Sequence, residues 1–188
     1  MAIKIFIDQG HNPTNPNAGA EGNGLREQDL TFEIGILLAE LLENDPNYEV
    51  RVSRPSLETQ LGTTNAQSLR IRTDEANNWG ADYFISLHAN ASSIASASGS
   101  EGYVYSLGGA AEQLAENILV GLTASTGLPD RGVFARPTLY VLRKTRMPAT
   151  LIELGFITNS GDAALMSENP QLFAQGIYNG LNRYFGLA

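Results

Sequence analysis

The sequence predicts an α/β fold, a single domain in which helices cover both faces of a largely parallel, twisted β-sheet. Short runs of β-branched and aromatic residues alternate along the chain with longer segments of helical periodicity. Strands separated by helices of ten or more residues are typical of βαβ units, in which the strands run parallel. The chain has 188 residues and no internal repeat, so we expect one domain over residues 1–188.

Each expected element follows from a local pattern. In the first helix, Leu30, Ile34, Leu38 and Leu41 recur at helical spacing, and a turn-forming segment that includes Pro46 ends it. The preceding segment, residues 10–24, is rich in Gly, Asn and Pro, so we expect an irregular loop. Strands are expected at residues 3–7, 48–53, 82–88, 101–107, 138–142 and 149–154. Helices are expected at residues 26–43, 66–79 and 110–126, and one or two more over residues 161–184, where Pro170 begins the last.

The composition limits the classes of function. A hydrophobic content of 43% and a charged content of 17% support a folded core. The formal net charge of -8 argues against a nucleic-acid partner, because an acidic chain repels phosphate. No apolar run is long enough to span a membrane, and the first residues do not resemble a signal peptide. Because the chain has no cysteine, disulfides, thiolate metal sites and cysteine nucleophiles are excluded.

The only two histidines, His11 and His88, each follow a predicted strand. In open parallel sheets, ligands bind beyond the carboxyl ends of the strands, so these two side chains could converge there. Neutral imidazole is the commonest zinc ligand. A single histidine is more often a hydrogen-bonded structural residue, so the hypothesis of a metal site depends on the pair together with nearby carboxylates.

Two glutamates could complete such a site. Glu27 begins the first helix, where an acid is also favoured by the helix dipole alone. Glu21, in the preceding loop, and Glu33 are alternative ligands. Glu153 lies within a strand of apolar and small residues, where a carboxylate is costly unless it is paired, binds metal or is functional. Burial would raise the pKa of Glu153 toward the range useful for proton transfer, although a buried ion pair is a competing explanation.

These residues suit a zinc hydrolase. A catalytic zinc site has three protein ligands and an open position, and His11, Glu27 and His88 supply a His₂Glu set. Zinc lowers the pKa of bound water, and a nearby glutamate such as Glu153 takes the proton. The sequence has no HExxH motif, so the zincin arrangement is excluded. Because the ligands are dispersed, their spacing alone is a weak signal.

Five segments, in order along nearly the whole chain, resemble the motifs of zinc-dependent N-acetylmuramoyl-L-alanine amidases of the amidase-3 type. They are residues 7–11, 27–30, 72–77, 85–90 and 148–159, and the most specific are SLHAN at 86–90 and ELGFITN at 153–159. The resemblance implies one catalytic α/β domain and one zinc ion per chain. The implied ligands are His11, Glu27 and His88, with Glu153 as general base. The family usually has Pro-Gly-His-Gly where this chain has Gln-Gly-His-Asn at 9–12, so substrate contacts there can differ.

The expected reaction is therefore cleavage of the amide bond between N-acetylmuramic acid and L-alanine in bacterial peptidoglycan. A zinc peptidase or carboxypeptidase acting on cell-wall peptides, and an inactive wall-binding module, are the alternatives. Asn90, Arg131 and Arg136 are further candidates for substrate contacts, because stem peptides carry carboxylates. We expect a monomer that acts at the cell wall, outside the cell or in the periplasm, or as a phage lysin released from the cytoplasm.

Overall fold

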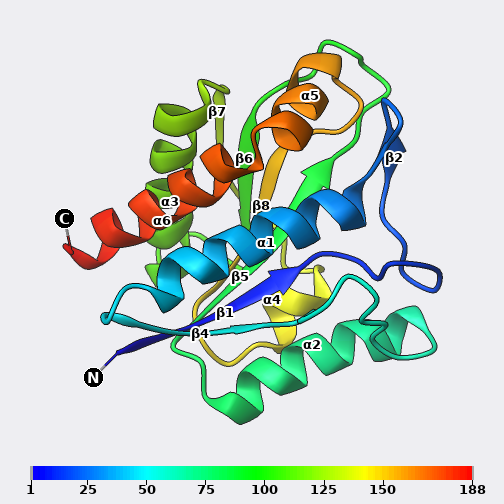
Figure 1. Cartoon of the computed structure of the whole chain (residues 1–188). Coiled ribbons are helices and arrows are strands. Elements are labelled where there is room, and N and C mark those ends of the chain that lie inside the picture. Colours follow the sequence, from blue (N-terminus) through cyan, green and yellow to red (C-terminus); the bar gives the residue numbers. More distant parts are fainter. Residues whose placement is uncertain (1, 188) are drawn as a thin grey trace.

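The computed structural model of the chain describes residues 2–187. Its centre is a six-stranded sheet with the strand order β4-β1-β5-β8-β6-β7 (Figure 1). Four of the five neighbouring pairs run parallel, and only β6 and β8 pair antiparallel. In sheet order the strands are Tyr48–Val52, Ile3–Gln9, Tyr83–Asn90, Ala149–Phe156, Ser100–Val104 and Asp130–Ala135. The prediction of an α/β domain with a largely parallel sheet is confirmed.

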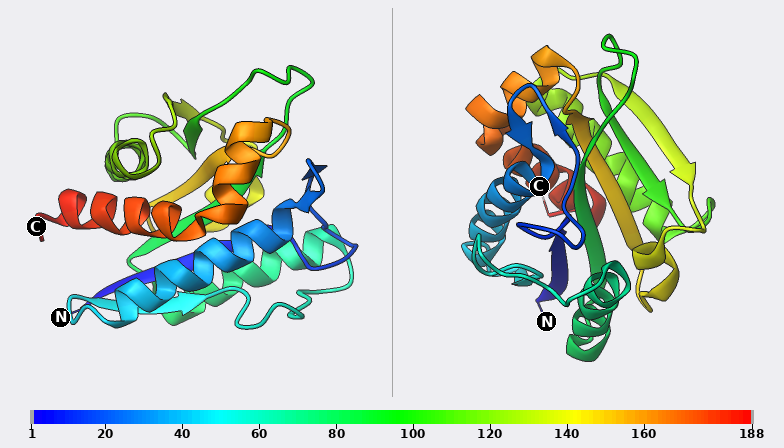
Figure 2. Two further views of the ribbon diagram at one scale, coloured as in Figure 1. Left: turned by 45° about the horizontal axis from the view of Figure 1, so that its top comes forward. Right: turned by 90° about the vertical axis from the view of Figure 1, so that its right-hand side faces the viewer.

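Helices cover both faces of the sheet. One face packs against α1 (Glu27–Glu43), α3 (Ala110–Thr126) and α6 (Pro170–Phe185). The other face carries α2 (Asn65–Trp79) and the short α4 (Tyr140–Lys144), while α5 (Ser160–Glu168) follows β8. The right-hand view of Figure 2 shows β1 between α1 and α2.

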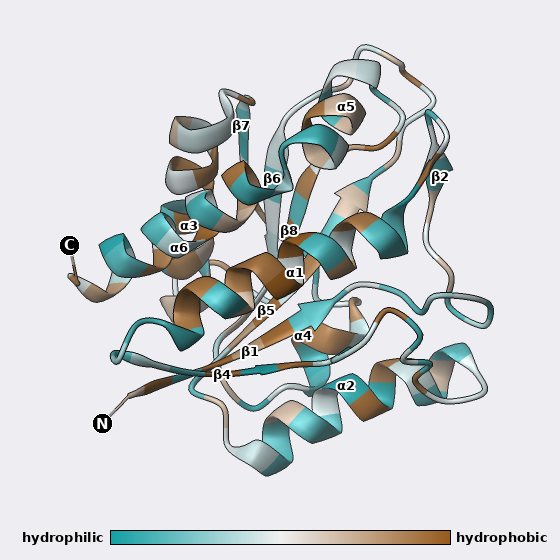
Figure 3. Cartoon of the chain, in the orientation of Figure 1, coloured by the Kyte–Doolittle hydropathy of each residue, from teal (hydrophilic) through white to brown (hydrophobic). Residues whose placement is uncertain are grey.

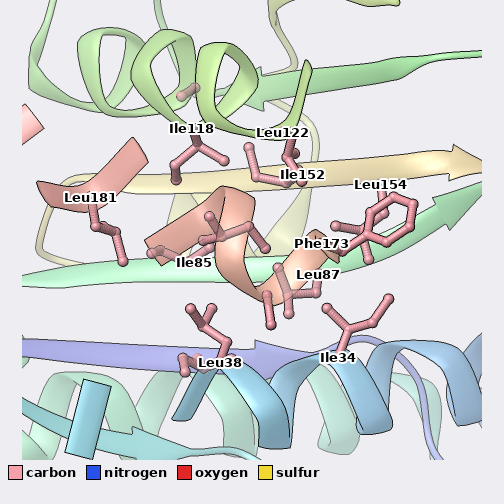
Figure 4. Packing of buried hydrophobic residues seen from close by; sticks show 14 of the residues in the cluster. Ile34, Leu38, Ile85, Leu87, Ile118, Leu122, Ile152, Leu154, Phe173 and Leu181 are labelled. Atoms are coloured by element: carbon pink, nitrogen blue, oxygen red, sulfur yellow. The ribbon is translucent and has the colours of Figure 1, made fainter. Parts of the chain in front are cut away.

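The main core lies under α1, α3 and α6. Because strand side chains alternate between faces, every second residue of the central strands points into this layer. Figure 4 shows Ile85, Leu87, Ile152 and Leu154 from β5 and β8 packed against side chains of the covering helices, among them Ile34. The ribbon of α1 is correspondingly hydrophobic over much of its length (Figure 3). This layer fixes the strands whose ends carry the candidate site.

A small hairpin interrupts the loop before α1. Strands β2 (Glu21–Gly22) and β3 (Leu25–Arg26) pair antiparallel. Asn23 and Gly24 join them with φ values of 52° and 76°, the positive values that a type I′ turn requires. The prediction of an irregular loop over 10–24 missed this Asn-Gly signal. The hairpin delivers the chain directly into α1, so it positions Glu27, the first helical residue.

The segment after α3 also differs from the prediction. Residues 138–142 were expected to form a strand, but they enter α4, and β7 lies earlier, at Asp130–Ala135. A short apolar run is compatible with either a strand or a buried helical turn, and here Val141 and Leu142 are buried from a helix. Strand β7 lies at the sheet edge and contains Gly132, so it lacks the apolar pattern of a central strand.

Among residues 2–187, no helix is long and apolar enough to cross a membrane. The expected domain boundaries, 1 and 188, lie outside the described residues.

Candidate functional site

Three side chains from separate segments meet at the carboxyl edge of β1 and β5. His11 follows β1 after one intervening glycine, His88 lies near the end of β5, and Glu27 begins α1. Glu27 Oε1 lies 3.1 Å from His11 Nε2 and 2.9 Å from His88 Nδ1. The two imidazole ring centres are 4.8 Å apart, with the rings nearly edge to face. The structure therefore brings together the two histidines and the glutamate that the sequence singled out.

Glu27 is held firmly in this position. Its Oε1 accepts a hydrogen bond from the amide of Ala89 at 3.0 Å, and its Oε2 accepts one from the amide of Ala20 at 2.8 Å. Burial alone raises the pKa of Glu27, but hydrogen bonds from His11 and His88 bring it well below its usual range. Burial lowers the pKa of His88, and the hydrogen bond and charge of Glu27 outweigh that effect, so the net direction is upward.

The residues fit a divalent cation. Their candidate ligand atoms all lie within 4.8 Å of one another. Nδ1 of His11 is buried and has no hydrogen-bond partner among the described residues. The backbone at Gly10 and Gly19 lies close to the candidate ligand atoms. A Cβ added at Gly10 would lie 2.8 Å from His88 Nε2, and one added at Gly19 would lie 2.8 Å from Glu27 Oε2. Two imidazoles and a carboxylate match the ligand preferences of zinc.

The two alternative glutamates lie elsewhere. Glu21 is exposed on the β2–β3 hairpin, and Glu33 is exposed on α1, two turns after Glu27. Within residues 2–187, neither belongs to a group of potential metal ligands. The geometry thus favours Glu27 over both alternatives.

Arg72 of α2 holds the loop that carries His11, a role that the sequence did not reveal. Its Nη1 donates to Asp8 Oδ1 and to the carbonyl of Gln9, both at 2.6 Å, and its Nη2 donates to the carbonyl of His11. His11 has a φ of 68°, a strained value for a residue with a side chain. The buried guanidinium stabilises this conformation. Asp8, near the end of β1, accepts hydrogen bonds from Arg72 and from the hydroxyl of Ser86.

Glu153 lies beside His88 in the parallel pairing of β5 and β8. Its Oε2 is buried without a hydrogen-bond partner among the described residues. The pKa of Glu153 is raised to about 7, mainly by burial; the charge of His88 opposes this rise, and the charges of Glu27 and Glu101 add to it. A carboxyl group with this pKa can accept and donate a proton near neutral pH. The alternative of a structural ion pair finds no support in these contacts.

A cavity of about 140 Å³ adjoins the two histidines. Its other walls are largely apolar and include Leu69 of α2, Leu151 of β8 and Val141 of α4. The short helix α4, where the sequence predicted a strand, therefore forms one side of the candidate site. The pocket gives a small apolar group of a ligand a place next to the candidate metal ligands.

Two of the three further substrate candidates, Asn90 and Arg131, bind a residue that the sequence did not single out, Glu101 of β6. Asn90 Nδ2 donates to Glu101 Oε1 at 2.6 Å, and Arg131 Nε donates to Glu101 Oε2 at 3.0 Å. The guanidinium of Arg136 lies 5.0 Å from the ring centre of Tyr103, whose hydroxyl also donates to Glu101. The signal that identified Glu153, an acid within a predicted strand, applied to Glu101 as well, but Glu101 stood at the expected start of its strand.

Comparison with known proteins identifies the family. Residues 5–183 match the model of Amidase_3, N-acetylmuramoyl-L-alanine amidase. The chain is 38% identical to the amidase CwlM of Bacillus licheniformis, over 99% of the chain and 70% of that protein. It is 37% identical to a sporulation-specific N-acetylmuramoyl-L-alanine amidase of Bacillus subtilis, over 98% and 69%.

Solved structures agree with this assignment. An N-acetylmuramoyl-L-alanine amidase from Clostridium difficile 630 superposes with a TM-score of 0.87 at 29% identity, covering 98% of this chain and 97% of the other. The family match spans nearly the whole sequence and includes every residue of the candidate site. The chain belongs to the Amidase_3 family of N-acetylmuramoyl-L-alanine amidases.

Proposed function

We propose that this chain hydrolyses the amide bond between N-acetylmuramic acid and L-alanine in peptidoglycan. The observation that carries the proposal is the convergence of His11, Glu27 and His88 beside Glu153, a half-buried acid whose Oε2 is buried without a compensating hydrogen bond. Membership of the amidase family supports the choice of bond. The proposed catalytic unit is the single domain of residues 1–188.

The proposed cofactor is one zinc ion per chain, held by His11, Glu27 and His88. When bound, zinc lowers the pKa of water and polarises an amide carbonyl. Ala20 and Ala89 orient the Glu27 carboxylate through their amides, and Arg72 fixes the backbone of His11. Such supporting contacts set the direction of metal ligands.

Proton transfer is assigned to Glu153. As a carboxylate it accepts the proton of the attacking water, and as a carboxylic acid it delivers that proton to the leaving nitrogen. Its pKa of about 7 allows both forms near neutral pH. Its buried Oε2 makes no hydrogen bond to the described residues, so no structural contact ties up the carboxyl group.

Asn90, Arg131 and Arg136 are proposed to contact the substrate. Arg136 is exposed and forms no ion pair with the described residues, so its guanidinium can bind a stem-peptide carboxylate. Arg131 retains donors beyond the one it directs to Glu101. We further propose a monomer that acts on the cell wall from outside the cytoplasm, or as a lysin of a phage.

The test is to measure metal content and bond cleavage together. We expect about one zinc per chain in the wild type, lost in His88→Ala, and new N-terminal alanine when wild-type protein digests purified peptidoglycan. Zinc without alanine release, but with other new amino termini, would favour a peptidase. Wall binding without any cleavage would favour an inactive binding module. Protein that binds no zinc would refute the proposed metal site.

A further inference from the structure

Two acids face each other across the antiparallel pairing of β6 and β8. Glu101 is the direct partner of Glu153 in this register. Directly opposed residues in such a pair have Cβ atoms roughly 4.5–5.5 Å apart, and like charges there are destabilising. Both side chains point to the face that carries the candidate site. Two carboxyl groups at this distance therefore need compensating hydrogen bonds or charges from neighbouring residues.

The two acids differ in the hydrogen bonds that their carboxyl groups accept. Glu101 has an exposed fraction of 7% and accepts hydrogen bonds from Asn90, Tyr103 and Arg131, so both of its oxygens are occupied. Glu153, in contrast, has a buried oxygen without any partner among the described residues. Three donors therefore fix the carboxylate of Glu101 in place, whereas no donor among the described residues fixes Oε2 of Glu153.

The donors to Glu101 come from three strands. Asn90 ends β5 two residues after His88, Tyr103 belongs to β6, and Arg131 belongs to the edge strand β7. The Arg131 guanidinium also lies 5.0 Å from the ring centre of Phe156, at the end of β8. One carboxylate thereby ties together the strand ends that surround Glu153.

We propose that Glu101 is a positioning residue, which holds Asn90, Tyr103 and Arg131 in one fixed wall beside Glu153. This inference rests on the hydrolysis proposed above and assigns Glu101 a role in that reaction. The wall orients the amide of Asn90 and the guanidinium of Arg131 toward the substrate side of Glu153. A substrate carbonyl or carboxylate would then meet donors that need no rearrangement during the reaction.

A purely structural role for Glu101 would predict something else. Buried ion pairs can often be replaced by apolar residues of similar volume without loss of stability, because desolvation offsets most of their attraction. A role in stability alone would therefore leave the turnover number of a folded variant unchanged. A positioning role predicts that turnover falls while folding and metal content persist.

The test compares Glu101→Leu, Glu101→Gln and the control Glu112→Gln. The control removes the same charge from an acid at the start of α3, where it accepts a hydrogen bond from Gly108, away from the site. We expect kcat of Glu101→Leu to fall about 100-fold, the cost of misplacing groups by roughly 1 Å, with little change in KM. Glu101→Gln retains an oxygen that can accept from Asn90 and Tyr103, so it should recover part of the loss.

Zinc content and the NMR signals of the Asn90 side-chain amide are measured on the same proteins. We expect unchanged zinc in every variant, and Asn90 signals that shift and exchange faster with solvent only when position 101 is leucine. Normal kcat in folded Glu101→Leu, loss of zinc, or unchanged Asn90 signals would each overturn the inference. A wild type that releases no alanine would refute the proposed reaction instead, and the Asn90 signals would then decide whether Glu101 positions this wall.

Discussion

The two faces of the central sheet are built by the same strands and carry different chemistry. Under α1, α3 and α6, the central strands present mainly apolar side chains, among them Ile5, Ile7, Ile85, Leu87, Ile152 and Leu154. The alternate positions of the same strands, on the face of α2 and α4, are largely polar near the carboxyl edge, namely Asp8, Ser86, His88 and Glu153. A shift of one residue in any strand would exchange the two sets.

This difference shows that one face of the sheet mainly supplies stability and the other mainly supplies chemistry. The apolar face gains free energy from burial and needs no specific partner for each group. On the site face, each buried polar group depends on a particular donor or acceptor, as Asp8 depends on Arg72 and Ser86. Oε2 of Glu153 and Nδ1 of His11 are exceptions, and uncompensated groups of this kind are typical of functional positions.

The largest expected effect comes from Glu153→Gln on the site face. Without a carboxyl group to transfer protons, kcat should fall by about 10²–10⁴-fold. Stability should change little, because Glu153 Oε2 makes no hydrogen bond that the substitution could break. The rate of alanine release and the midpoint of thermal unfolding provide the two measurements. A loss of stability comparable to that of a core substitution would contradict the division between the faces.

A substitution at Ile152, the residue before Glu153 in β8, tests the opposite face of the sheet. Ile152 is fully buried against the helices, so Ile152→Ala should lower the free energy of unfolding by about 2–5 kcal/mol. The kcat of the remaining folded protein should stay close to the wild-type value. Urea denaturation and active-enzyme titration separate these quantities. If kcat fell as far as in Glu153→Gln, the apolar face would be shaping the chemistry directly.

Much of this arrangement could be predicted from sequence because periodicity and strand ends are local signals. The hydrophobic spacing in α1 and the apolar run of β5 identified elements that the structure contains. His11 and His88 were found because each follows a strand, and strand ends gather at one edge of a parallel sheet. Position along the chain does not separate Glu27 from Glu21 and Glu33, because all three lie near the same loop and helix; the family resemblance implied Glu27, and in the structure only Glu27 of the three lies with the two histidines.

The features that the sequence did not reveal depend on contacts between distant segments. Arg72 lies 61 positions from His11, and nothing in its own helix indicates that its guanidinium fixes the backbone there. Glu101 becomes informative only when β6 pairs with β8 and three donors converge on it. The short segment of α4 was ambiguous because four or five apolar residues fit either a strand or a helical turn.

The smallest expected effect is a loss of wild-type stability on acidification, which follows from the buried ion pair of Asp8 with Arg72. Burial raises the pKa of Asp8, but the charge and hydrogen bond of Arg72, aided by Ser86, outweigh that effect and hold it below the value of an unfolded aspartate. The resulting stability is fully present above the unfolded pKa of about 4 and is lost as the pH falls through the folded pKa. We therefore expect the free energy of unfolding to decrease below about pH 4.

Urea denaturation across this range, on wild type, Asp8→Asn and the exposed control Asp74→Asn, measures the effect. Asp8→Asn should be less stable at neutral pH, because Arg72 loses its charged partner, and should lose less stability on acidification than the wild type. Asp74→Asn should follow the wild type, since its side chain lies exposed on α2. Parallel acid curves for Asp8→Asn and the wild type would mean that this ion pair does not stabilise the site face through its charge.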